Sequence, residues 1–195
     1  MAHKVQRAPH PTGSLAGQLL IAMPGLSDGR FTRSVICICA HSPEGAMGLV
    51  LNRPIPKLSF EALLRQLGIE PTPPQRRIRL VNGGPVEEGR GFVLHSGDWH
   101  GEGSLPVAGG FTLTANVDIL KAIAEGGGPR QCLLALGYAA WGPGQLDAEM
   151  AANAWLTATP DEALVFDPDT DTTWARAMSS LGVDPGRLAE AAGHA

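Results

Sequence analysis

Short continuous runs of apolar residues are the feature that most restricts how this chain can fold. Residues 19–23 read LLIAM, residues 34–40 read SVICICA and residues 132–136 read CLLAL. Runs of this length without regular polar alternation are typical of strands whose two faces are both buried. Residues 45–51 continue the pattern after a Ser-Pro-Glu-Gly turn, so residues 32–52 are predicted to form a hairpin.

Helical spacing is clearest in residues 60–67. Apolar residues recur there at i, i+3, i+4 and i+7, Ser59 precedes them as a candidate N-cap, and Gly68 follows them. Other helices are predicted at residues 117–124, 145–154, 173–181 and 185–192, and other strands at residues 78–81, 91–95 and 111–113. This order lacks the steady strand–helix alternation of a doubly wound sheet. It predicts an α+β fold in which helices surround a mixed sheet.

Length and composition indicate one domain. The chain has 195 residues without a change of composition along it, so residues 15–195 are predicted to form a single domain. Residues 1–14 lack the apolar stretch of a signal peptide and are predicted to be a disordered arm. No run reaches the length of a membrane span, and the three cysteines lack the spacing of a secreted disulfide framework. These features predict a soluble, cytoplasmic protein without membrane contact.

The charge balance argues against direct nucleic-acid binding. Lys and Arg number 15 against 19 Asp and Glu, a formal net charge of −4. The longest basic block is residues 75–77 with Arg79 close by. That block is too small for the concentrated positive surface that phosphate backbones require.

Two patterns resemble a catalytic and a metal site, but their surroundings favour structural roles. Residues 25–29 match G-x-S-x-G with Ser27 in the place of a hydrolase nucleophile, yet a strand rather than a helix is predicted to follow, so a glycine loop is expected. Cys37, Cys39 and His41 alternate along one predicted strand at roughly 6.5 to 7 Å spacing, which suits the ligands of one ion poorly. They are predicted to be core residues, and neither a metal nor a cofactor is expected.

Polar residues at the ends of predicted strands are candidates for a binding site. Asn52 and Arg53 supply an amide and a fixed positive charge that suit a carboxylate or phosphate, although a strand-end cap paired to an acidic neighbour is the simpler interpretation. Asn82 begins an Asn-Gly-Gly-Pro segment that could offer N–H groups to an anion but is better interpreted as a tight turn. His95 is a candidate general base or ligand-binding residue, against the alternative of a hydrogen-bonded structural imidazole.

Residues 137–146, GYAAWGPGQL, join a predicted strand to a helix through an aromatic, glycine-rich turn. Trp141 in this turn is interpreted first as a packing residue, with the lining of a pocket as the alternative. Gln145 and Glu149 lie four positions apart, so they share one face of the predicted helix.

Taken together, these segments resemble the AlgH/YqgE family of bacterial proteins over about residues 15–193. The matching stretches are residues 17–24, Phe31 with Ser34 and Val35, residues 45–54, residues 82–86, residues 91–95, and residues 137–146 with Glu149, Asn153, Ala154 and Trp155. The resemblance implies a bent mixed sheet that forms a partial barrel flanked by helices.

Members of the family are mostly uncharacterised, and the AlgH name implies a genetic link to transcriptional control of alginate production. No catalytic residue carries over. The family-motif positions nominated as a ligand or partner site are Asn52, Arg53, Asn82, His95, Trp141, Gln145 and Glu149.

The sequence leaves three functional hypotheses. The first is a cytosolic regulatory or binding protein, including an indirect transcriptional regulator, that acts through a small ligand or a protein partner. The alternative is a hydrolase-type enzyme with a cleft around His95, Asn52 and Arg53, which requires these side chains to converge on one concave surface. The third is a purely structural or interaction domain, because glycine-rich motifs often serve backbone geometry.

Overall fold

The computed structural model describes residues 13–72 and 76–192. Its strands are β1 Leu19–Ala22, β2 Val35–Ser42, β3 Gly45–Val50, β4 Arg79–Asn82, β5 Val86–Ser96, β6 Ser104–Val107, β7 Phe111–Thr114, β8 Cys132–Trp141 and β9 Trp155–Ala158. Its helices are α1 Phe60–Gln66, α2 Asp118–Ala124, α3 Gln145–Ala151, α4 Glu162–Val165, α5 Thr173–Ser180 and α6 Pro185–Ala192, with a 3-10 turn, η1, at Gly29–Phe31. Most of the predicted terminal arm lies outside the described residues.

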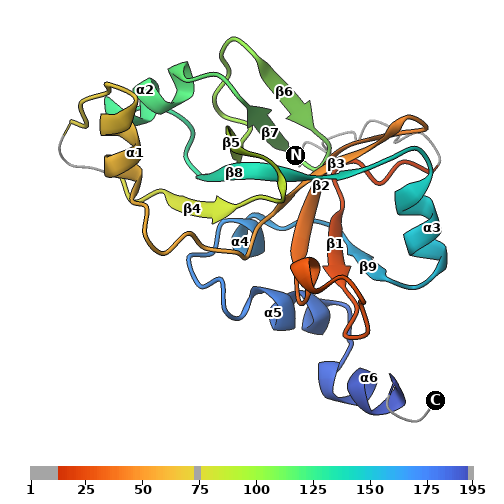
Figure 1. Cartoon of the computed structure of the whole chain (residues 1–195). Coiled ribbons are helices and arrows are strands. Elements are labelled where there is room, and N and C mark those ends of the chain that lie inside the picture. Colours follow the sequence, from red (N-terminus) through yellow and green to blue (C-terminus); the bar gives the residue numbers. More distant parts are fainter. Residues whose placement is uncertain (1–12, 73–75, 193–195) are drawn as a thin grey trace, which may run out of the picture.

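The strands form one curled mixed sheet in the order β6-β7-β5-β8-β3-β2-β1-β9, with β4 added beside β8. The long strand β8 is its spine, because β5 pairs with most of its length and β3 pairs with its last residues. Only β4 runs parallel to its neighbour; every other named pair is antiparallel. Figure 1 shows β8 crossing the middle of the molecule.

The two ends of the curled sheet approach each other at the turn between β6 and β7. A Cβ at Gly17, just before β1, would lie 2.4 Å from Ala108 in this turn, so only glycine fits there. Pro160, just after β9, packs beside Gly109 in the same turn. The sheet is therefore a partial barrel, and the predicted α+β fold with a bent mixed sheet is confirmed.

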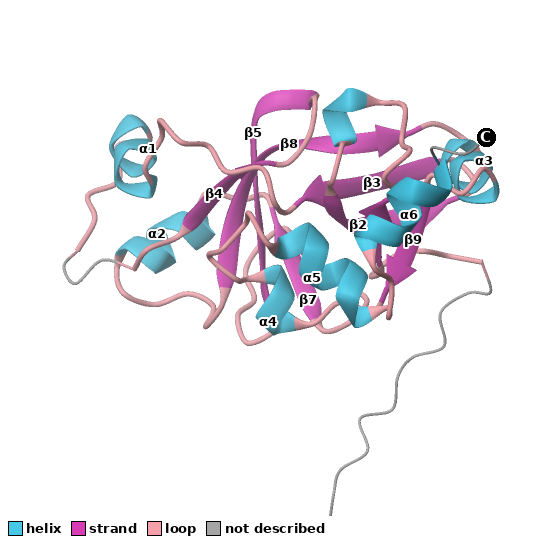
Figure 2. Ribbon diagram, turned by 90° about the horizontal axis from the view of Figure 1, so that it is seen from below, coloured by secondary structure: helices cyan, strands magenta, loops and turns pink. Residues whose placement is uncertain are grey.

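Apolar residues fill both the inside and the outside of the curl. Leu19 and Ile21 of β1 belong to the inner cluster, whereas Leu20 and Ala22 belong to an outer one, and all four are fully buried. This confirms that β1 is buried on both faces. The inner cluster is closed by α4 and α5, and the two outer clusters lie under α3 and under α1 with α2. Figure 2 shows α4 and α5 in front of the strands, between α1 and α2 at one end and α3 at the other.

The structure corrects several predicted boundaries. The helix predicted at residues 145–154 ends at Ala151, because Asn153 adopts a positive φ of 56° and turns the chain into β9. The strand predicted at residues 132–136 continues to Trp141, since β3 and β5 both pair with its second half. Strands β6 and β9 were not predicted at all. None of the described helices is long and apolar enough to cross a bilayer.

Candidate functional site

Asn52 acts as a clamp on the turn between η1 and β2. Its Oδ1 accepts the Val35 backbone N–H at 2.9 Å, and its Nδ2 donates to the Arg33 carbonyl at 2.8 Å. The side chain is only 7% exposed, so each polar atom is satisfied where water has little access. Asn52 is therefore a strand-end cap, as the simpler interpretation predicted, but the predicted acidic neighbour is wrong, because both of its partners are backbone groups.

Arg53 follows the clamp and reaches the same turn from the side. Its guanidinium donates to the Thr32 carbonyl and lies 3.4 Å from the Ser34 hydroxyl. Burial lowers the pKa of Arg53, which remains charged at neutral pH. Within the described part of the chain, no carboxylate lies within ion-pairing distance of this guanidinium. A half-buried positive charge is thus held by neutral acceptors alone.

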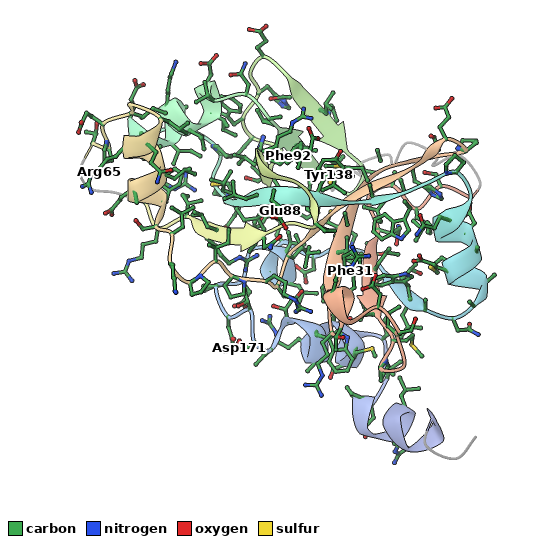
Figure 3. All side chains as sticks on the ribbon, viewed as in Figure 1. Phe31, Arg65, Glu88, Phe92, Tyr138 and Asp171 are labelled. Carbon is green, nitrogen blue, oxygen red and sulfur yellow. The ribbon has the colours of Figure 1, made fainter. Side chains whose placement is uncertain are left out.

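A groove of about 380 Å³ opens beside Arg53, and we call it the Arg53 groove. It is lined by Arg30, Phe31, Val50, Arg53, Pro54, Asn82, Gly84, Pro85 and Glu88. Arg30 is paired with Asp28 at 2.8 Å, so Arg53 is the cation here that lacks a protein counter-ion among the described residues. Figure 3 shows the labelled Phe31 and Glu88 in the middle of the molecule, whereas Arg65 lies on α1 at one end.

The Asn-Gly-Gly-Pro segment forms the crossover from β4 to β5 beside this groove. A Cβ at Gly84, where φ is +151°, would lie 2.1 Å from the Tyr138 carbonyl carbon, so the chain crosses β8 at a distance that only glycine permits. Asn82 Oδ1 accepts the Gly84 N–H at 3.1 Å. This geometry agrees with the tight-turn interpretation, and Asn82 lines the groove.

Trp141, Gln145 and Glu149 meet in one hydrogen-bonded network with Trp155. Glu149 Oε2 accepts the indole N–H of Trp141 at 3.0 Å and that of Trp155 at 2.8 Å, and its Oε1 accepts the Gln145 amide at 3.1 Å. The two indoles meet edge to face, with ring centroids 6.2 Å apart. Phe31 packs edge-on against Trp155 at 6.1 Å, which connects this network to the Arg53 groove.

His95 lies elsewhere and is fully buried. Its Nδ1 is 2.8 Å from the Ser96 carbonyl oxygen, which can only accept, so Nδ1 carries the proton. Its Nε2 then accepts from the Thr114 hydroxyl at 2.9 Å, and that hydroxyl is in turn 2.8 Å from the Ser104 hydroxyl. Burial lowers the pKa of His95 and keeps the ring neutral.

The structure does not bring His95 to Asn52 and Arg53. His95 pairs with Cys132 on one side of β8, whereas Asn82, beside the Arg53 groove, pairs with Leu136 on the other side. Four residues of strand separate these positions by about 13 Å along β8. The cleft that the hydrolase alternative requires is therefore not formed by these residues.

The other conspicuous motifs have structural surroundings. Ser27 is exposed and is followed by η1 and β2 rather than by an α-helix, as expected for a glycine loop. No group of three or more metal-binding side chains occurs in residues 13–72 and 76–192. In the basic block, Arg76 donates to the carbonyls of Pro129 and Arg130, and Arg79 donates to those of Val165 and Asp167. These arginines hold backbone segments together.

Comparison with known proteins places this geometry in a family. The model of the AlgH-like family matches residues 19–186. The chain is 51% identical over 183 residues to a UPF0301 protein of Rhodospirillum rubrum, covering 94% of this chain and 95% of that protein. It is 53% identical over 182 residues to a UPF0301 protein of Cereibacter sphaeroides, covering 93% and 99%. The chain belongs to the AlgH-like family.

Solved structures of similar proteins agree with this fold. The solution structure of the AlgH protein from Pseudomonas aeruginosa superposes with a TM-score of 0.76 at 40% identity, covering 96% of this chain and 100% of that one. A crystal structure of a protein from Corynebacterium diphtheriae gives a TM-score of 0.68 at 23% identity, covering 90% of each chain, and supports the fold alone.

The family-motif positions nominated from the sequence thus fall into three places. Arg53 and Asn82 line the Arg53 groove, and Asn52 holds the turn next to it. Trp141, Gln145 and Glu149 form the indole network, which Phe31 contacts through Trp155. His95 lies apart from both. The sequence did not indicate Arg30, Glu88 or Trp155 as site residues. They lie on η1, β5 and β9, and only the folded sheet brings these elements to the two places.

Proposed function

We propose that this chain is a regulatory binding protein and that a small anionic ligand occupies the Arg53 groove. One observation carries the proposal: a half-buried guanidinium lines a groove of about 380 Å³ and has no carboxylate partner among the described residues. Guanidinium groups bind carboxylates and phosphates through paired N–H donors. Grooves of this size are typical of small-molecule sites.

The lining favours a ligand with both acidic and polar groups. Arg53 and the Asn82 amide supply donors on one wall, and Glu88 supplies an acceptor that suits a hydroxyl or an ammonium group. Phe31, Val50 and Pro54 supply apolar contact. An organic acid or a phosphorylated metabolite that carries a hydroxyl or amino group fits this arrangement.

Thermal unfolding against sugar phosphates, nucleotides and organic acids tests the proposal. A ligand at about 100 times its Kd adds roughly 2.7 kcal/mol of stability, which raises Tm by roughly 5 to 10 °C in a chain of this size. Arg53→Gln is expected to abolish the shift, each variant being compared with its own unliganded Tm. Arg65→Gln is the matched control, because it removes the same charge from an exposed position on α1. No shift with any of these anions, or a shift that survives Arg53→Gln, contradicts the proposal.

A further inference from the structure

Arg33 holds a backbone conformation that side chains rarely adopt. Its φ is 54°, in the left-handed region, which costs a residue with a Cβ about 1 to 2 kcal/mol. The Asn52 amide donates to the Arg33 carbonyl at 2.8 Å and keeps the turn in this form. Glycine would fit the same turn without the steric cost. The arginine side chain at this position therefore invites a functional explanation.

The Arg33 guanidinium lies over a fixed aromatic ring. Its central carbon lies 5.2 Å from the ring centroid of Trp174. Trp174 is 7% exposed and donates its indole N–H to the Ala22 carbonyl at 2.8 Å. An arginine placed over an aromatic ring uses the charge of its guanidinium in this contact and keeps N–H donors for a further partner. No hydrogen-bond acceptor or carboxylate of residues 13–72 and 76–192 pairs with this guanidinium.

Arg33 lines a second groove, of about 430 Å³, which we call the Arg33 groove. It is lined by Met23, Pro24, Leu26, Thr32, Arg33, Trp174, Pro185 and Gly186. Its walls are mostly apolar, and none of its lining residues is acidic. Figure 1 shows the loop that follows β1 beside α5, with α6 beyond it. The Arg53 groove lies against Arg30 and Phe31 of the same loop, so the two grooves have different linings.

We propose that the Arg33 groove binds a carboxylate that carries an apolar chain. The carboxylate takes the in-plane donors of Arg33 as a bidentate pair, and the chain lies against Met23, Leu26 and Pro185. An anion is favoured over an uncharged or cationic ligand, because Arg33 is the charged residue of a lining that contains no acidic residue. This proposal does not depend on the Arg53 groove.

NMR titration of the full chain with octanoate tests the proposal, with octan-1-ol and acetate as matched probes. The readout is the ¹H–¹⁵N signal of the Trp174 indole, identified by its absence from Trp174→Phe. Octanoate is expected to move this signal saturably, whereas octan-1-ol lacks the charge and acetate lacks the chain, so both are expected to bind at least about tenfold more weakly.

Two variants separate ligand binding from folding. Arg33→Asn is expected to weaken octanoate binding about tenfold, while the fold persists because Asn tolerates the left-handed region. Arg33→Lys keeps the charge but not the planar fork, and an intermediate affinity is expected. Arg65→Gln is expected to bind octanoate as the wild type does.

Three results would overturn the proposal. They are no saturable shift with octanoate, equal affinity for octan-1-ol, and unchanged affinity in Arg33→Asn. If octanoate produces no shift but a Glu-rich peptide does, the groove is instead a peptide-binding surface.

Discussion

The hydrogen bonds of Glu149 lead to the sharpest stability prediction. One carboxylate serves both indole N–H groups, from Trp141 and Trp155, and the amide of Gln145. The two tryptophans are only 6% and 4% exposed. Replacing Glu149 by Leu removes every acceptor and leaves two buried indole donors without partners.

An unpaired buried donor costs about 1 to 3 kcal/mol. Water reaches part of the space around the half-buried Glu149, so Glu149→Leu is expected to lower the free energy of unfolding by about 2 to 4 kcal/mol. Glu149→Gln keeps one oxygen for both indoles but turns its amide towards that of Gln145, and is expected to cost about 1 kcal/mol. Exchanging the two residues, Glu149→Gln with Gln145→Glu, restores a donor and an acceptor and is expected to recover most of that loss.

Urea titrations followed by far-ultraviolet circular dichroism measure these differences. Wild type, Glu149→Gln, Gln145→Glu and the exchange variant form a double-mutant cycle, and Glu149→Leu is compared with the wild type alone. A loss below about 0.5 kcal/mol in Glu149→Leu, the range of ordinary surface substitutions, would refute the reasoning. So would an exchange variant that is no more stable than Glu149→Gln.

Three other predictions follow from the same contacts. Asn52→Ala removes both bonds of the clamp and is expected to lower the free energy of unfolding in urea by about 2 to 3 kcal/mol; an unchanged midpoint would refute the clamp. Burial lowers the pKa of His95, so the unfolded chain binds the proton more readily, and stability is expected to fall as pH decreases from about 6.5. His95→Gln is expected to make Tm depend less on pH below about 6.5, and an unchanged dependence of Tm on pH counts against this assignment. Gly84→Ala places a Cβ 2.1 Å from Tyr138 and is expected to prevent folding in circular dichroism, whereas Gly89→Ala, with nothing within 4 Å, is expected to fold normally. Equal folding of both would contradict the close crossing.

The parts of the fold that depend on local pattern were predictable. The apolar run of β1 predicted burial on both faces, and Ser59 caps α1 by accepting the Ala62 N–H at 3.1 Å. Strands β6 and β9 were missed because each has four residues at an end of the sheet. Such short edge strands are held by their neighbours in space, so their own sequences carry little signal.

The candidate site was predictable residue by residue but not as an arrangement. Asn52 and Arg53 were indicated as candidates by their place after a strand, and their role as a binding site stays a prediction. The i, i+4 spacing correctly placed Gln145 beside Glu149. Nothing in the sequence indicates that Trp155 shares the Glu149 carboxylate, because that contact depends on β9 pairing with β1. The separation of His95 likewise follows from the register of β5 on β8, which only the sheet defines.

An NMR titration with inorganic phosphate and with malate tests the Arg53 groove most directly, because it reports on each backbone amide. The account predicts saturable shifts that cluster at Phe31, Arg53 and Gly84, disappear in Arg53→Gln and persist in Arg65→Gln. Shifts scattered over the surface, or the same shifts in Arg53→Gln, would contradict an anion site in this groove.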